Sequence, residues 1–140
     1  LIVVESDAVV PDNGLNGVRN ALAELPTRPG AYLNLAGGLD HSNLGIEKLI
    51  VERFPGFVSF EPPVTNTSCA YALNRELATG LCAFLEAEPE SRALGIDWLF
   101  NAFFLRQATT QPSIVCLHSE PPALLHGSIQ GLTQSWHPDR

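Results

Sequence analysis

The sequence predicts a single α/β domain, in which helices pack against a sheet. Segments with strand-like and helix-like patterns alternate along the chain, and this order is typical of layered α/β folds. The 140 residues are enough for one domain and too few for two of ordinary size. Hydrophobic residues make up 45% of the chain and charged residues 16%, so we expect residues 1–140 to fold around a substantial core.

The first third of the chain predicts two strands and a helix. Residues 1–4 are a continuous apolar, β-branched run, which predicts a strand buried on both faces at the centre of the sheet. Apolar residues recur at helical spacing over residues 15–25, and this helix should stop before Pro26. Residues 31–35 predict a second strand, which the glycines at 37–38 should close.

The middle of the chain is less regular before a second clear strand. Residues 39–56 favour a short helix or an irregular excursion, and residues 57–60 a short strand. Residues 68–73 predict a strand that leads directly into a helix N-cap at Asn74. The helix after this cap should bury the apolar stripe that runs over residues 77–85.

The last third predicts one more helix and at least one more strand. The helix begins near Asp97 and is followed by a strand over residues 113–117. A further strand over residues 123–125 is weaker. Residues 126–140 are rich in Gly, Ser, Gln and His, so we expect a loop or tail there.

The charge balance argues against nucleic acid as a partner. Fifteen acidic residues face eight basic ones, for a net charge of −7, and the basic residues form no cluster. A face that binds phosphate backbones needs such a cluster, whereas an acidic metal site suits this composition. The chain also lacks a run of about 18 apolar residues, so we expect no membrane span in it.

The three cysteines predict neither a zinc ribbon nor a disulfide framework. Cys69, Cys82 and Cys116 include no C-x-x-C pair, and an odd number cannot be fully bridged within one chain. Their apolar neighbours favour buried, reduced thiols.

Glu5-Ser6-Asp7 is the first candidate site, because ligands of open α/β sheets collect at the carboxyl ends of strands. In extended backbone, Glu5 and Asp7 point the same way while Ser6 points elsewhere. Two carboxylates on one side favour a hard divalent cation such as Mg²⁺ or Mn²⁺. The alternative is that Asp7 caps the turn and Glu5 is solvated.

Asp97 and His126 are the other candidates. Asp97 lies where an apolar helix starts, so it is either a helix N-cap or a carboxylate available as a general base. His126 precedes Gly127 and Ser128, a pattern that suggests a loop carrying an imidazole toward a ligand; the alternative is an ordinary surface histidine.

Taken in order, these segments resemble glycosyltransferase family 25, which includes lipopolysaccharide-type sugar transferases and collagen galactosyltransferases. The resemblance rests on the Glu-x-Asp after the first strand and on residues 69–75, Cys-Ala-Tyr-Ala-Leu-Asn-Arg, before a helix. It continues in register through residues 86–97 and 119–128. It extends to about residue 136 and is weakest over residues 39–60.

The resemblance implies a GT-A-like fold, a mixed sheet flanked by helices, and a site for a UDP-sugar. Asp7 would be the direct ligand to Mn²⁺ (or Mg²⁺), assisted by Glu5 and His126, and Asp97 would be the base that takes a proton from the acceptor hydroxyl. The substrate contacts would be Tyr71, Trp98, Gly127 and Ser128.

The function implied is inverting transfer of a hexose, such as galactose, to a hydroxyl of a glycan, a lipid-linked saccharide or a protein. The alternative is a non-catalytic sugar- or partner-binding domain of the same fold. That alternative is favoured by Ser6, which stands where the family commonly has Asp, and by a chain that begins in mid-strand without Met, as if an N-terminal segment were missing. A metal-dependent phosphoester hydrolase ranks third.

Overall fold

The computed structural model describes residues 1–27, 30–37, 45–65, 67–109 and 114–132. The strands are β1 (Ile2–Val4), β2 (Ala8–Val9), β3 (Ala31–Asn34), β4 (Ala36–Gly37), β5 (Ile50–Phe54), β6 (Gly56–Phe60), β7 (Ala70–Leu73), β8 (Val115–Glu120) and β9 (Leu124–His126). The helices are α1 (Gly14–Glu24), α2 (Arg75–Ala87) and α3 (Ile96–Ala108), with 3-10 turns at Leu25–Thr27, Glu47–Leu49 and Pro89–Ala93.

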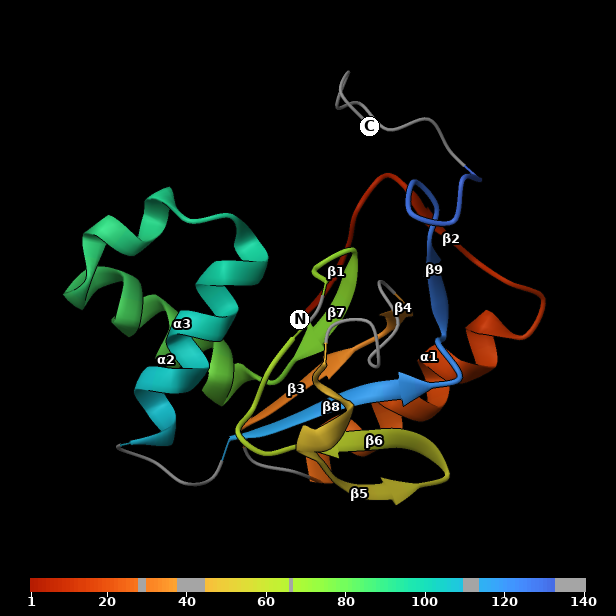
Figure 1. Ribbon diagram of the computed structural model, residues 1–140, viewed down its shortest axis with the longest axis horizontal. Helices are drawn as coiled ribbons and strands as arrows, with labels where there is room; N and C mark the ends of the chain where they lie inside the picture. Colours follow the sequence, from red (N-terminus) through yellow and green to blue (C-terminus); the bar gives the residue numbers. More distant parts are fainter. Residues whose placement is uncertain (28–29, 38–44, 66, 110–113, 133–140) are drawn as a thin grey trace.

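Two sheets organise the described part of the chain, and helices flank the larger one (Figure 1). The larger is a mixed, six-stranded sheet in the order β1-β7-β3-β8-β6-β5, in which β3 and β8 run parallel and the other pairs run antiparallel. The smaller sheet has the order β2-β9-β4. The predicted α/β class with a mixed, helix-flanked sheet is therefore confirmed.

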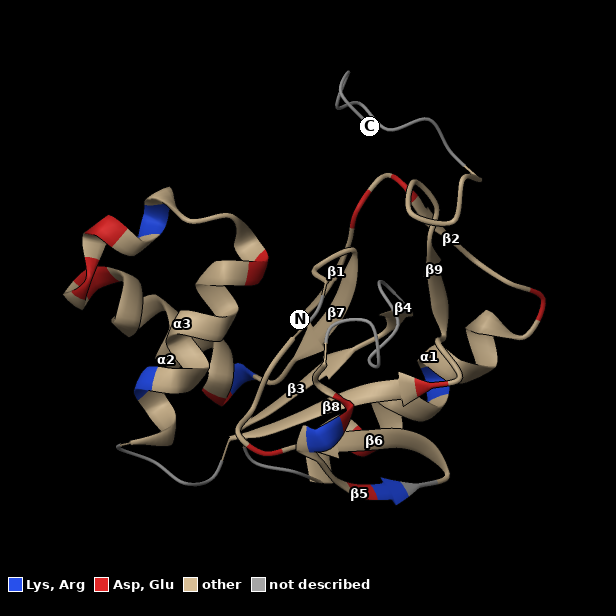
Figure 2. Cartoon of the chain, in the orientation of Figure 1, with Lys and Arg blue, Asp and Glu red and all other residues tan. Residues whose placement is uncertain are grey.

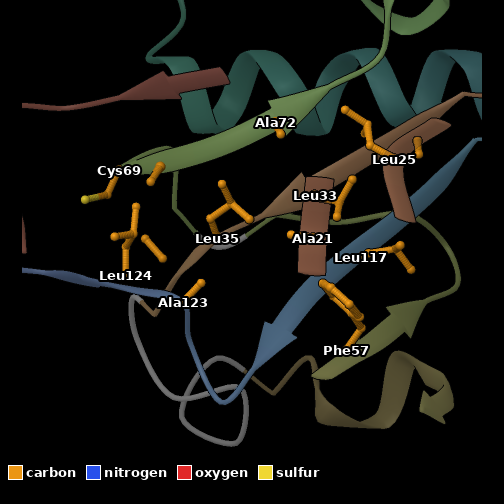
Figure 3. Close-up of a cluster of buried hydrophobic side chains, with 13 residues drawn as sticks. Ala21, Leu25, Leu33, Leu35, Phe57, Cys69, Ala72, Leu117, Ala123 and Leu124 are labelled. Atoms are coloured by element: carbon orange, nitrogen blue, oxygen red, sulfur yellow. The ribbon is translucent and has the colours of Figure 1, made fainter. Parts of the chain in front are cut away.

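Alternating side chains of the central strands supply a hydrophobic core on each face of the larger sheet. Leu33 of β3 belongs to the cluster that includes Ala21 and Leu25 at the α1 side (Figure 3). Its neighbour Tyr32 belongs to the second cluster, with Phe100 and other apolar residues of α2 and α3. Successive residues of a strand point to opposite faces, so β3 joins both cores.

Local sequence signals explain where the helices start and stop. The Asn74 side chain accepts a hydrogen bond from the Leu77 amide at 2.9 Å, so the predicted N-cap of α2 is confirmed. Helix α1 ends at Glu24, before Pro26, as predicted. At its other end, a Cβ on Gly14 would lie 2.4 Å from the Ala123 carbonyl oxygen, so only glycine lets α1 approach the segment before β9.

The prediction that the first strand is central and buried on both faces is wrong. Strand β1 is the edge of the larger sheet, and Leu1, Ile2 and Val4 are 69%, 44% and 54% exposed. An apolar run identifies a strand but not its neighbours, and here the two innermost strands are β3 and β8.

Sequence reasoning located the remaining elements unevenly. Strand β6 confirms the predicted strand over residues 57–60 and starts one residue earlier. Strand β5 was missed because exposed Glu52 and Arg53 interrupt its apolar pattern. Strand β9 includes His126, so the predicted tail starts one residue later. Residues 38–44, 110–113 and 133–140 lie outside the described residues. Parts of four predictions fall on them: the closing glycines at 37–38, the segment 39–56, the strand 113–117 and the tail 126–140. Among the helices that are described, none combines the length and apolarity of a bilayer span.

Candidate metal centre

Four potential metal ligands from three separate segments meet at the end of β1 and β9. Glu5 and Asp7 lie between β1 and β2, Cys69 immediately precedes β7, and His126 ends β9. One ligand atom from each of these residues lies within 4.8 Å of the ligand atoms of the other three. We call these four residues the metal centre.

Backbone pairing brings these distant segments together. The Glu5 amide donates to the Cys69 carbonyl at 2.8 Å, and the Gly127 amide donates to the Asp7 carbonyl at 2.8 Å. In addition, β2 pairs antiparallel with β9, with Ala8 opposite His126. The positions of all four ligands are thus set by main-chain hydrogen bonds.

Glu5 and Asp7 converge through a turn rather than through the alternation of an extended strand. Strand β1 ends at Val4, and the Ala8 amide donates to the Glu5 carbonyl at 3.1 Å across the turn. The predicted pair is the one that meets, but the predicted backbone geometry is wrong. Ser6, between them, is exposed and outside the metal centre.

Asp7 is held as a carboxylate by its neighbours. Ser128 Oγ donates to Asp7 Oδ2 at 2.6 Å, and His126 Nδ1 lies 3.1 Å from the same oxygen. The hydrogen bond from Ser128 lowers the pKa of Asp7, and nearby His126 adds to this effect, whereas partial burial opposes it. Glu5 is more exposed, and its Oε1 accepts from Ser68 Oγ at 3.3 Å.

The Ser128, His126 and Asp7 contacts do not form the relay of a hydrolase. Ser128 Oγ lies 3.1 Å from His126 Nδ1, the same ring nitrogen that faces Asp7. A nucleophilic serine and its orienting carboxylate need to bind opposite nitrogens of the imidazole. Ser128 and Gly127, predicted as substrate contacts, here hold Asp7 through its side chain and its carbonyl.

Cys69 is the member of the metal centre that sequence reasoning missed as a ligand. Its thiol lies 3.8 Å from Asp7 Oδ1, and burial, followed by the negative charges of Asp7 and Glu5, raises its pKa to about 12. The sequence held no C-x-x-C signal, and apolar neighbours indicated an inert thiol. All three cysteines are free, as expected, and Cys69 and Cys116 are buried, but Cys82 is exposed.

Asp97 is not the N-cap of α3, so the first of the two predictions for this residue is wrong. The N-cap is Gly95, and Asp97 Oδ1 is buried with no hydrogen-bond partner among the described residues. The negative charges of Glu5 and Asp97 both contribute to a raised pKa of Tyr71, after its burial. Trp98, beside Asp97 in the sequence, is 72% exposed.

The described basic residues lie away from the strands that carry the metal centre. The described Lys and Arg residues lie on or beside α1, α2, α3 and β5, and none lies on β1, β2, β7 or β9 (Figure 2). Two carboxylates, a thiol and an imidazole are a donor set that divalent metals use. The residues present therefore fit a metal ion.

The comparisons with known proteins leave the family open: no family model matches this chain, and no curated protein or solved structure matches it.

Proposed function

We propose that this chain is a metal-dependent glycosyltransferase domain with a GT-A-like fold, which transfers a hexose, such as galactose, from a UDP-sugar to a hydroxyl acceptor. The observation that carries the proposal is the convergence of Asp7, Glu5 and His126. The resemblance to family 25 implied these three metal ligands from positions far apart in the chain, and they lie within reach of one ion.

Asp7, Glu5 and His126 would hold Mn²⁺ or Mg²⁺ together with the diphosphate of the donor. The chemistry that a divalent cation supplies at such a site is neutralisation of charge that develops on the departing nucleoside diphosphate. Ser128 orients the Asp7 carboxylate through its hydrogen bond. The position of Ser6 outside the metal centre supports a working acidic motif despite the departure from the family pattern.

Asp97 would act as the general base of inverting transfer. A base must accept the proton of the acceptor hydroxyl, and Asp97 has a buried carboxylate oxygen that no described residue engages. Tyr71 would donate a hydrogen bond to the substrate. The exposed ring of Trp98 would offer a stacking surface for a glycan, lipid-linked saccharide or protein acceptor.

The test is thermal unfolding of the full chain with UDP, Mn²⁺ or both. A ligand that binds only the folded state raises the melting temperature, so we expect the largest rise with both ligands together. Asp7→Ala should abolish this joint rise. Asp12→Ala, which removes an exposed acid outside the metal centre, is the matched control and should retain it.

Catalysis is tested by turnover of UDP-galactose with a hydroxyl acceptor. Asp97→Asn should keep the joint effect of UDP and Mn²⁺ but lower turnover by about 10²-fold or more, the usual contribution of a general base. UDP binding that is indifferent to metal would contradict the proposal and favour the non-catalytic sugar- or partner-binding domain.

A further inference from the structure

Cys69 adds a sulfur atom to the carboxylates and imidazole of the metal centre. Its Sγ is one of the four ligand atoms that lie within 4.8 Å of one another. Metal–ligand bonds of about 2.0–2.3 Å separate two ligands by up to about 4.6 Å across one ion, so small side-chain movements bring all four onto it. The sulfur is therefore within reach of an ion that the other three residues bind.

The sulfur is directed out of the apolar core and held in that position. Figure 3 shows Cys69 at the margin of the hydrophobic cluster, with its sulfur pointing away from the other labelled side chains. The Cys69 amide donates to Thr67 Oγ1 at 3.2 Å, and its carbonyl accepts from the Glu5 amide at 2.8 Å. With the backbone bound on both sides, the thiol remains against Asp7.

Access for an ion comes from the side of the carboxylates. Cys69 is 0% exposed, so it cannot meet an ion from solvent on its own. The side chains of Asp7 and His126 retain 22% and 17% exposure, and Glu5 is exposed. An ion that binds these three residues first comes within reach of the buried sulfur.

We infer that Cys69 is a ligand of the metal centre, and that its sulfur makes the centre selective for a thiophilic divalent metal, Zn²⁺ or Co²⁺, over Mg²⁺. The inference rests on the proposed function, because it uses the same metal centre, and it narrows the choice of ion there by disfavouring Mg²⁺. Thiolate ligands favour Zn²⁺ and related transition metals, whereas Mg²⁺ requires oxygen ligands in octahedral geometry. On binding, the S–H bond breaks, an S–metal bond forms, and the proton passes to buffer.

Such an ion would also join the two sheets. Cys69 leads into β7 of the larger sheet, His126 belongs to β9 of the smaller one, and Glu5 and Asp7 lie on the turn that connects β1 and β2. Bonds to residues of both sheets resist their separation, so Zn²⁺ should stabilise the folded chain through linkage.

The test is a titration of the full metal-free chain with Co²⁺, followed by optical absorption. Coordination by sulfur produces a near-ultraviolet charge-transfer band, which oxygen and nitrogen ligands do not. We expect this band in the wild-type chain and in Cys82→Ser, which removes the exposed thiol as a matched control. Cys69→Ser, whose hydroxyl retains a donor to Asp7, should fold normally by circular dichroism and lack the band.

Competition titrations with Zn²⁺ and Mg²⁺ separate a ligand from a residue that only supports the fold. Cys69→Ser should weaken Zn²⁺ binding by about 100-fold or more and change Mg²⁺ binding by less than about twofold. Equal losses for both ions, or a charge-transfer band that persists in Cys69→Ser, would overturn the inference. Failure of the proposed function would look different, because the band would remain while UDP binding stayed indifferent to metal.

Discussion

Two groups of polar side chains lie near the start of β7, and they differ in the charges that they bring together. The first is the metal centre. The second, which we call the Asn34 network, consists of Tyr32, Asn34, Thr65, Thr67 and Asn101. Both join segments that are distant in the sequence.

In the Asn34 network, neutral donors face neutral acceptors. Asn34 Nδ2 donates to Thr65 Oγ1 at 3.0 Å and to the Thr67 carbonyl at 2.8 Å, while its Oδ1 accepts from the Ala36 amide at 3.1 Å. Asn101 exchanges hydrogen bonds with both the amide and the carbonyl of Thr65. A buried network satisfied in this way is complete without any ligand.

In the metal centre, two carboxylates share one site. The hydroxyls of Ser128 and Ser68 and the thiol of Cys69 are each directed at a carboxylate, yet Asp7 and Glu5 still bring two negative charges together. Like charges are costly when they gather, unless a cation joins them. A satisfied neutral cluster therefore supports the fold, whereas a cluster that gathers like charges indicates a binding site for a cation.

The largest expected effect is on stability, from Asn34→Leu. This change removes the buried acceptor of the Ala36 amide and two hydrogen bonds that Asn34 Nδ2 donates, to Thr65 Oγ1 and to the Thr67 carbonyl, so we expect the free energy of unfolding to fall by about 3 kcal/mol. Urea unfolding in the absence of metal measures it. Glu5→Gln, in the exposed part of the metal centre, is the control and should change stability by less than about 0.5 kcal/mol. Similar losses of unfolding free energy in both variants would contradict the view that the Asn34 network supports the fold and the metal centre does not.

Removal of metal should have the next largest effect, and only where the metal centre is intact. At a free Zn²⁺ concentration about 100 times its dissociation constant, linkage adds about 2.7 kcal/mol to the free energy of unfolding. A chelator should therefore lower the melting temperature of the wild-type chain. His126→Ala should unfold at the same temperature with and without chelator, and a shift as large as that of the wild type would contradict a role for this imidazole.

A smaller effect is expected from Ser128→Ala, which removes the hydroxyl that donates to Asp7 at 2.6 Å. Loss of a group that orients a ligand weakens metal binding by about tenfold, or about 1.4 kcal/mol. Isothermal titration with Zn²⁺ measures this change. Ser6→Ala alters the same turn outside the metal centre and should bind as the wild type does; equal weakening in both variants would show that the turn, not the hydroxyl, matters.

Much of the fold and part of the metal centre could be predicted because they depend on local patterns. The Asn74 cap, the end of α1 before Pro26 and the strand β3 each follow from residues within a few positions of one another. The pair Glu5 and Asp7 was found in the same way, since its two members are separated by a single residue.

Only the tertiary structure decided which residues that are distant in the sequence lie close together. The edge position of β1 follows from its pairing with β7, and the meeting of Cys69 with His126 follows from strand pairings on both sides of the Glu5–Asp7 turn. These contacts depend on long-range hydrogen bonds whose partners leave no mark on the local sequence. Local sequence thus determined most of the helices and strands of this protein and the pair Glu5 and Asp7. Long-range packing determined where these elements lie and brought the sulfur of Cys69 next to the two acids.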